Sequence, residues 1–294
     1  MRDTVAVVVT YNRKELLRGC LRCLREQKSP CDILVVDNAS TDGTEEMLRP
    51  MIDAGEIRYH NTGENLGGAG GFSEGLKTAV HLGYQYIWLM DDDTEVREDA
   101  LFRLLSADRR LQGNYGFLSG TAYFQKTDEL CSMNIQRSGW HTKVSDYASP
   151  EVPVVMATFV SFFIKAETVR RFGLPIRDFF IWADDLEYSR RISRELPCYM
   201  VPGSRADHMM KSNDKVGIEQ ESPDRLWRYE CLYRNERVLY RREGIAGRIY
   251  LLLRVLYHMA RVILYAKSQK AEKLRVILRS YRAGRRFRPA VEYP

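Results

Sequence analysis

The chain has 294 residues, of which 45% are hydrophobic and 29% charged, and this balance excludes an intrinsically disordered chain. The length predicts one large domain with an appendage. The formal net charge is +6, but residues 245–294 alone carry +10 and residues 1–244 carry −4. The basic character is therefore confined to the C-terminal tail, and such a tail usually contacts an anionic surface.

The N-terminal residues and the cysteines both favour a reducing compartment. Only five apolar residues, 5–9, precede the first polar loop, and this run is too short for a signal peptide or a membrane anchor. The spacing of the six cysteines matches neither a zinc site nor a disulfide framework. Cys20 and Cys23 lie in a helical apolar pattern, which favours small core residues over a redox pair. We therefore expect a cytoplasmic protein with free thiols.

Four short apolar runs dominate the first hundred residues, and each ends in a polar or glycine-rich stretch. We expect strands at residues 4–9, 33–36, 57–60 and 86–90. Helical patterns between them predict right-handed crossovers and a parallel sheet. Because ligands bind at the carboxyl edge of such a sheet, the four loops that follow the strands are expected to form one site.

The rest of the chain changes character twice. Residues 115–165 read as strand-like or mixed, and residues 179–192, FFIWADDLEYSRRI, are expected to begin a helix. A strand is expected at residues 198–202. From Ile245 the pattern is mainly helical, so we place a boundary near Arg241, between a domain at 1–241 and a tail at 242–294.

Asp91, Asp92 and Asp93 directly follow the fourth expected strand. Three adjacent carboxylates raise one another's pKa unless a cation neutralises them. Their oxygens suit Mg²⁺ or Mn²⁺, which often bridge protein carboxylates and phosphate oxygens. A solvated acidic loop at a helix start is the alternative. The preceding buried strand and the neighbouring polar loops favour the metal site.

A second acidic group, with Asp184, Asp185 and Glu187, follows Trp182. A carboxylate beside a second carboxylate and an aromatic ring can have a pKa raised toward neutrality, which suits a general base. The equal alternative is that these side chains cap the helix and complement its dipole. His208 follows the strand expected at 198–202, and a lone histidine of this kind is more often structural than a metal ligand.

Residues 65–72, NLGGAGGF, contain four glycines, which let backbone N–H groups approach a phosphate or sugar closely. The spacing is not G-x-G-x-x-G, which disfavours a dinucleotide site, and the absence of G-K-[ST] excludes a P-loop. The run still predicts close approach to a ligand.

The segment 245–270 has apolar residues at helical spacing, interrupted by Arg254 and Arg261. These arginines disfavour a membrane span, whereas a helix lying on anionic lipid fits the composition. Packing on its own domain or on a second subunit is nearly as good an explanation. No nucleic-acid-reading motif accompanies the basic residues.

Several of these stretches together resemble family 2 glycosyltransferases of the GT-A fold, namely VAVVVTYNR at 5–13, VVDNASTDGT at 35–44 and the acidic run. NLGGAGGF, WLMDDD and FIWADDLEY followed by His208 resemble bacterial galactofuranosyltransferases, which use UDP-galactofuranose. The resemblance covers residues 4–240. It implies an α/β GT-A nucleotide-sugar-binding fold with a mixed, mostly parallel sheet, followed by the basic amphipathic helical tail.

The resemblance also implies roles. Asp91, Asp93 and His208 would hold Mn²⁺ or Mg²⁺, and Asp185 would be the general base of an inverting transfer. Trp182 and Asp184 would position the acceptor, although Ala183 interrupts the W-D-D pattern common in the family. The donor-binding set would be Thr10, Tyr11, Arg13, Asp37, Asn65, Gly68, Gly70, Gly71 and Asp92.

The implied acceptor is a glycan or a polyprenyl-linked sugar of a bacterial surface polysaccharide, handled at the inner face of the membrane. A rhamnosyltransferase that uses dTDP-rhamnose is the main alternative, because its nucleotide loops would look alike. A sugar-nucleotide-binding module without activity is the alternative from another class, and a homo-oligomer is compatible with the tail.

Overall fold

The computed structural model describes residues 2–214 and 216–294. The chain forms two compact units. The first comprises Met1–Arg177, Asp185–Asn213 and Val291–Pro294, and the second comprises Asp178–Asp184 and Asp214–Ala290. The boundary expected near Arg241 falls inside the second unit, at the end of a helix.

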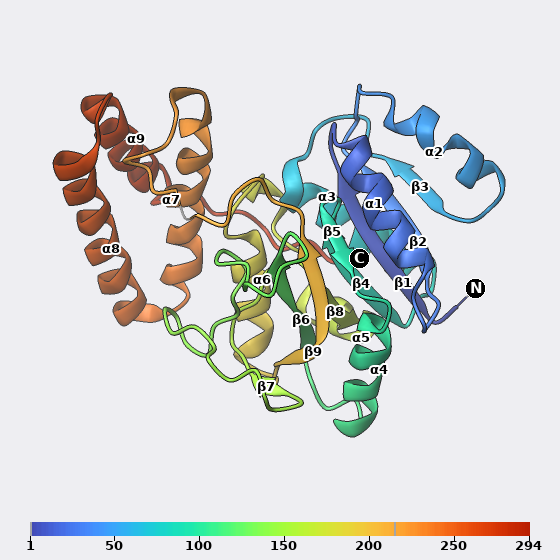
Figure 1. Ribbon diagram of the computed structural model, residues 1–294. Helices are drawn as coiled ribbons and strands as arrows, with labels where there is room; N and C mark the ends of the chain where they lie inside the picture. The colour runs from blue at the N-terminus through green and yellow to red at the C-terminus, as the bar shows by residue number, and fades with distance from the viewer. Residues whose placement is uncertain (1, 215) are drawn as a thin grey trace. The chain divides into compact units, whose positions relative to one another are not determined.

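The first unit is built on a mixed sheet, which has nine strands within the described residues (Figure 1). The strand order is β3-β2-β1-β4-β8-β6-β9-β5, with β7 paired to β9. The strands are β1 (Thr4–Thr10), β2 (Asp32–Asp37), β3 (Arg58–Asn61), β4 (Tyr86–Asp91), β5 (Thr94–Val96), β6 (Phe117–Phe124), β7 (Val152–Pro153), β8 (Phe162–Lys165) and β9 (Tyr199–His208).

The strands β3, β2, β1 and β4 are parallel, as the sequence predicts. All seven residues of β1 are buried, which explains its uninterrupted apolar run. The register pairs Thr10 with Asp37 and Val9 with Asp91, so the last residues of these three strands lie at one edge. The polar loops therefore gather where a parallel sheet binds its ligands.

Helices cover both faces of this sheet. They are α1 (Lys14–Arg25), α2 (Thr44–Asp53), α3 (Gly67–His81), α4 (Ala100–Arg110), α5 (Ala166–Phe172) and α6 (Asp184–Ser193), with a 3-10 turn η1 at Arg177–Phe179. One core contains Leu17 of α1, Leu48 of α2 and Leu104 of α4. The opposite core contains Leu76 of α3 and Ile192 of α6. The mixed α/β class that the sequence predicts is confirmed.

The glycine-rich run does not form an open loop, since α3 begins at Gly67 and includes the other glycines. A Cβ atom at Gly71 would collide with Val9, and one at Gly75 would collide with Val7, so these glycines let α3 pack closely on β1. A Cβ atom at Gly70 would collide with Leu66, the residue before α3, whereas one at Gly68 would meet no protein atom within 4 Å. The glycines are expected to let the backbone approach a ligand, but Gly71 and Gly75 instead let the helix approach the sheet.

β9 extends beyond the strand expected at 198–202 and continues to His208. Its pairing with β6 shifts register, because Met200 pairs with Ser119 and Arg205 pairs with Thr121. The bulge between these pairs contains Pro202, which has no N–H to donate to a ladder. Proline therefore interrupts the pairing without ending the strand, and His208 is its last residue.

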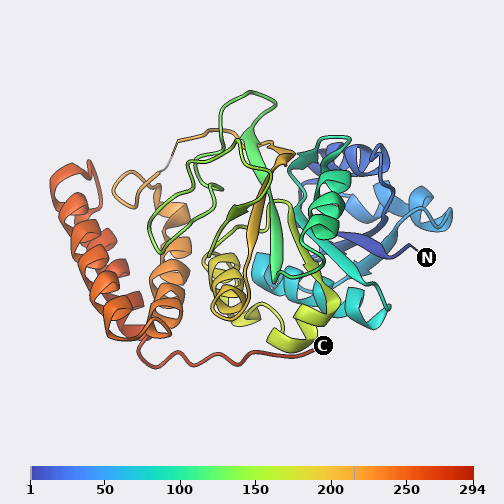
Figure 2. The same ribbon diagram turned by 90° about the horizontal axis from the view of Figure 1, so that it is seen from below.

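The second unit contains the 3-10 turn η2 (Pro223–Arg225) and the helices α7 (Leu226–Arg241), α8 (Gly244–Tyr265) and α9 (Lys270–Ala283). Figure 2 shows these three helices side by side. Tyr233, Val255 and Ile277 are buried in the unit, one on each helix. Within the described residues, none of the helices has the length and apolarity to cross a membrane. The helical tail that the sequence predicts is confirmed.

Candidate functional site

The acidic run lies at the turn between two strands. Asp91 is the last residue of β4, and β5 begins at Thr94. β5 pairs antiparallel with β9, with Thr94 opposite His208, and the Met209 N–H donates to the Asp93 carbonyl at 2.8 Å. This pairing brings His208 beside Asp93 across 115 residues of sequence.

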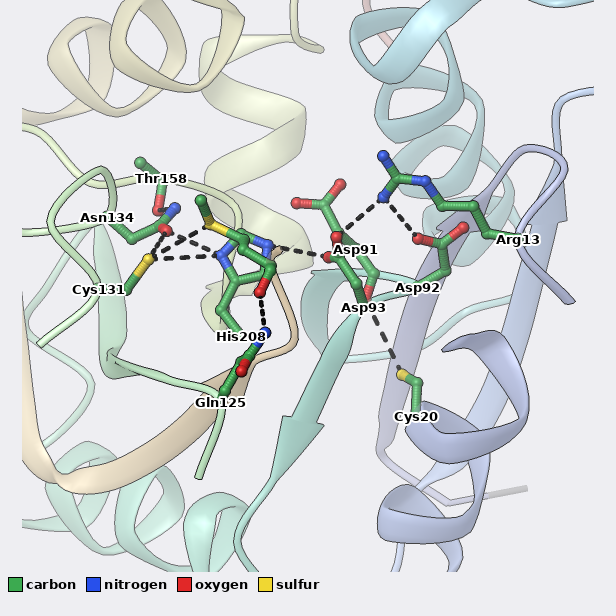
Figure 3. Close-up of polar contacts among 11 residues, drawn as sticks. Arg13, Cys20, Asp91, Asp92, Asp93, Gln125, Cys131, Asn134, Thr158 and His208 are labelled. Atoms are coloured by element: carbon green, nitrogen blue, oxygen red, sulfur yellow. Dashed lines mark hydrogen bonds and ion pairs between the residues drawn. The ribbon is translucent and has the colours of Figure 1, made fainter. Parts of the chain in front are cut away.

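Asp93 is the centre of the contacts in Figure 3. One carboxylate oxygen, Oδ2, lies 2.9 Å from Arg13 Nη1, and the other, Oδ1, lies 2.9 Å from His208 Nε2. Arg13 also lies 3.3 Å from Asp92, and the Thr10 hydroxyl donates to Asp92 at 2.8 Å. The structure thus brings together five of the residues that the sequence singles out.

His208 is oriented by Asn134, which the sequence does not single out. Asn134 Oδ1 accepts from His208 Nδ1 at 2.9 Å, and Asn134 Nδ2 donates to Thr158 Oγ1 at 3.0 Å. The Cys131 thiol donates to the same Asn134 oxygen at 2.9 Å. An amide oxygen can only accept, so Nδ1 of His208 carries a proton, and this contact fixes the ring with Nε2 facing Asp93.

The three carboxylates differ in their ionisation. Burial raises the pKa of Asp91 to about 7, helped by the charge of Asp93. Burial also raises the pKa of Asp92 to about 6, although Arg13 opposes the shift. Burial alone would raise the pKa of Asp93 as well, but the hydrogen bond with His208 and the charges of His208 and Arg13 together outweigh burial and lower this pKa. The acidic run therefore has one firmly charged member, Asp93, and two that resist ionisation without a cation.

Burial alone would lower the pKa of His208, but the contacts with Asp93 and Cys131 and the negative charges of Asp93 and Asp91 together raise it to about 10. A neutral His208 with its proton on Nδ1 would point a lone pair at a carboxylate oxygen 2.9 Å away. Something positive has to lie between these two acceptors, either a proton on Nε2 or a metal ion. A carboxylate and an imidazole are suitable ligands for Mn²⁺, so the donor set fits a divalent cation.

The protein alone does not complete such a site. Among residues 2–214 and 216–294, no group of three or more His, Cys, Asp or Glu side chains is arranged to hold a metal ion. Figure 3 draws no hydrogen bond or ion pair between the Asp91 carboxylate and the other side chains shown. A cation here would take further ligands from Asp91 after a side-chain movement, from water or from a bound diphosphate.

The remaining donor-binding candidates are divided. Asp37 is fully buried and accepts from the Tyr59 hydroxyl at 2.7 Å and from the Ser40 N–H at 2.8 Å, so it fixes the loop after β2. Tyr11 is 41% exposed in the loop after β1. The exposed Asn65 accepts from the Gly67 N–H at 2.9 Å and so steadies the start of α3. The Tyr11 side chain is thus more accessible than Asp37 to the nucleobase of a bound donor.

The helix expected to begin within residues 179–192 begins at Asp184. Phe180, Trp182 and Ala183 have φ values of +64°, +66° and +67°, a region that side chains with a Cβ rarely adopt. Helix formation at this point is prevented by the left-handed backbone. We call residues 179–183 the left-handed segment.

Asn235 of α7 holds the left-handed segment. Its side-chain amide, fully buried, donates to the carbonyls of Phe179 at 2.9 Å, Ile181 at 3.1 Å and Trp182 at 2.9 Å. The Trp182 ring also packs edge-on against Tyr229, with centroids 5.1 Å apart. These contacts all lie in the second unit, to which Trp182 and Asp184 belong. They compensate the strain of the segment.

Asp185 belongs to the first unit and is half-buried in the first turn of α6. Burial raises its pKa to about 6, and the Leu186 N–H, which donates to Asp185 at 2.7 Å, opposes the shift. Ser189, one turn later, accepts from the Ala157 N–H at 3.1 Å. The next residue after Ala157 is Thr158, which binds Asn134. Adjacent residues 157 and 158 therefore contact both the helix that carries Asp185 and Asn134, the side chain that orients His208.

Residues 5–167 match the family model described as "Glycosyl transferase family 2", so the chain belongs to glycosyl transferase family 2. It is 28% identical over 209 residues to galactofuranosyltransferase GlfT1 of Mycolicibacterium smegmatis, a match that covers 64% of this chain and 65% of the relative. The GlfT1 protein of Mycobacterium tuberculosis is 28% identical over 200 residues, with 64% of each chain covered.

Solved structures support the fold at low sequence identity. GalNAc-T7 with UDP, GalNAc and Mn²⁺ has a TM-score of 0.66 and 14% identity, covering 96% of this chain and 55% of that one. S. aureus TarS 1-349 in complex with UDP has a TM-score of 0.57 and 15% identity, covering 94% and 70%. The chain spans just under two thirds of the length of the GlfT1 relatives.

We predict that Asn235→Leu loosens the left-handed segment, because three carbonyls lose their donor while the side chain keeps its approximate volume. A loss of this kind costs about 1–3 kcal/mol. Hydrogen–deuterium exchange of peptides covering residues 179–183 is expected to accelerate. Gln220→Leu, at an exposed position of the same unit, is the control. Unchanged exchange in the Asn235 variant would show that the segment holds its conformation by itself.

Proposed function

We propose that the protein is an inverting, metal-dependent glycosyltransferase that transfers galactofuranose from UDP-galactofuranose to a glycan or polyprenyl-linked acceptor. The observation that carries the proposal is the Asp93 cluster, in which Arg13 and His208 bind opposite oxygens of one carboxylate at the carboxyl edge of the sheet. Two GlfT1 relatives named as galactofuranosyltransferases support the choice of sugar. Bacterial surface polysaccharide synthesis is the corresponding process.

On the donor side, Tyr11 and Arg13 bind the nucleotide, and Gly68 lies against the donor because a side chain there would meet no protein atom. Thr10 and Arg13 hold Asp92 in place. Asp37 and Asn65 act indirectly, since each stabilises a loop of the donor site. Gly70 and Gly71 act through packing, because a side chain at Gly70 would collide with Leu66 at the start of α3 and one at Gly71 would collide with Val9 of β1.

Asp91, Asp93 and His208 would hold Mn²⁺ or Mg²⁺ together with the diphosphate. When bound, the ion neutralises the charge that develops on the departing nucleotide diphosphate. Asn134 keeps Nε2 of His208 directed at Asp93, and Arg13 supplies a positive charge beside the same carboxylate. The Mn²⁺-containing structure of GalNAc-T7 supports a divalent ion in this fold.

On the acceptor side, Asp185 is the general base. The acceptor hydroxyl oxygen bonds to the anomeric carbon, the bond from that carbon to the diphosphate breaks, and the hydroxyl proton passes to Asp185. Attack from the face opposite the leaving group inverts the anomeric configuration. Trp182 and Asp184 position the acceptor sugar, and Asn235 keeps Trp182 in its left-handed conformation.

A panel of UDP- and dTDP-sugars tests the donor. We expect UDP-galactofuranose to be hydrolysed and transferred faster than UDP-galactopyranose or dTDP-rhamnose, with release of the nucleotide diphosphate as the measurement. Preference for dTDP-rhamnose would replace this assignment with a rhamnosyltransferase. Tight donor binding with no turnover of any sugar would indicate a non-catalytic sugar-nucleotide-binding module.

Asp185→Asn removes the proton acceptor and keeps the shape of the side chain. We expect transfer to fall by about 10²- to 10⁴-fold, the usual contribution of general base catalysis, with UDP binding retained. In the unaltered protein the base is active as the carboxylate, so transfer should fall as the pH drops through about 6. This acidic limb should be absent from the residual activity of the variant. Asp128→Asn, at an exposed aspartate, is the control, and near-normal turnover of the Asp185 variant would refute the assignment.

A further inference from the structure

Helix α8 exposes a broad apolar face. Its members are between 45% and 76% exposed, and at about 100° per residue their positions fall on one side of the helix. They are Ile245, Ile249, Leu252, Leu253, Leu256, Tyr257, Ile263 and Leu264. We call this set the α8 face. Large aliphatic side chains at such density are rare on a soluble surface unless the surface binds something.

The arginines within α8 do not interrupt this face. Arg254 turns toward α7, where its Nη2 lies 3.1 Å from Glu236, and Arg261 pairs with Glu219. Both glutamates are buried. The charges of Arg254 and Arg261, which disfavour a membrane span, are thus neutralised by buried glutamates beside the α8 face. Between positions 249 and 264, every exposed residue is uncharged.

Positive charge gathers at the ends of the helix instead. The pKa of Arg241, just before α8, is lowered by partial burial and by the charges of Arg288, Arg242 and others nearby. Arg248 is exposed in the first turns of α8, and Lys267 is exposed just beyond its last residue. This crowding of cations is unfavourable by itself and is relieved by an anionic partner.

We propose that the α8 face docks on the surface of a bilayer containing anionic phospholipid. In this arrangement α8 lies in the plane of the interface, its apolar side chains enter the acyl boundary, and the terminal arginines and Lys267 meet the phosphates. At about 100° per residue the face spans an arc of about 140°, broader than the a/d seam of a coiled coil, which favours a lipid surface over a second copy of the chain.

Sedimentation of the full chain with liposomes tests this proposal. The probes are vesicles of phosphatidylcholine with and without phosphatidylglycerol, used without donor or acceptor, so the outcome is independent of the proposed reaction. Leu253→Glu/Leu256→Glu places two charges in the α8 face. Phe102→Glu/Met133→Glu makes the same kind of change at exposed apolar positions of the first unit and is the matched control.

We expect the unaltered chain and the control to bind the anionic vesicles, with binding weakened by salt, and the α8 variant to bind at least about tenfold less. Circular dichroism establishes that both variants are folded. Equal binding by the α8 variant, or no binding by the unaltered chain, would overturn the proposal. So would light scattering that shows an oligomer dissociated by the α8 substitutions while lipid binding persists, because the face would then be a contact between copies of the chain.

Discussion

The sharing of one carboxylate between two cationic groups organises the candidate site. Asp93 is buried, and an unpaired buried carboxylate would be strongly destabilising. Arg13 comes from the loop after β1 and His208 from the end of β9, so the two contacts of Asp93 connect the first and last parts of the sheet. The site therefore depends on the short pairing of β5 with β9, which no local pattern in the acidic run requires.

The two parts of the sheet have different tasks. The parallel strands β1, β2 and β4 end in the loops that supply Thr10, Arg13 and the acidic run. The remaining strands bring in His208 and the segment that anchors α6. In the proposed reaction the parallel part holds the donor. The other part supplies a metal ligand and supports the helix with the base.

The features that the sequence predicts are those that depend on residues close together in the sequence. Uninterrupted apolar runs mark β1 and β2, because strands buried on both faces need no alternation. Asn134 and Asn235 carry no such signal. Asn134 lies 74 residues from His208, and Asn235 is more than fifty residues from the carbonyls it binds. The left-handed residues 182 and 183 interrupt an otherwise good helical pattern, since tertiary hydrogen bonds override local propensity there. The pairing of Arg254 and Arg261 with distant glutamates is equally non-local.

The central claim is that a divalent cation replaces the proton between Asp93 and His208 when the nucleotide binds. A crystal structure of the protein with UDP and Mn²⁺ tests it most directly. We expect anomalous density for Mn²⁺ bonded to an Asp93 oxygen, to His208 Nε2 and to the diphosphate, with the direct hydrogen bond of 2.9 Å lost. Bound UDP with the Asp93–His208 hydrogen bond intact, and no metal beside it, would contradict the account.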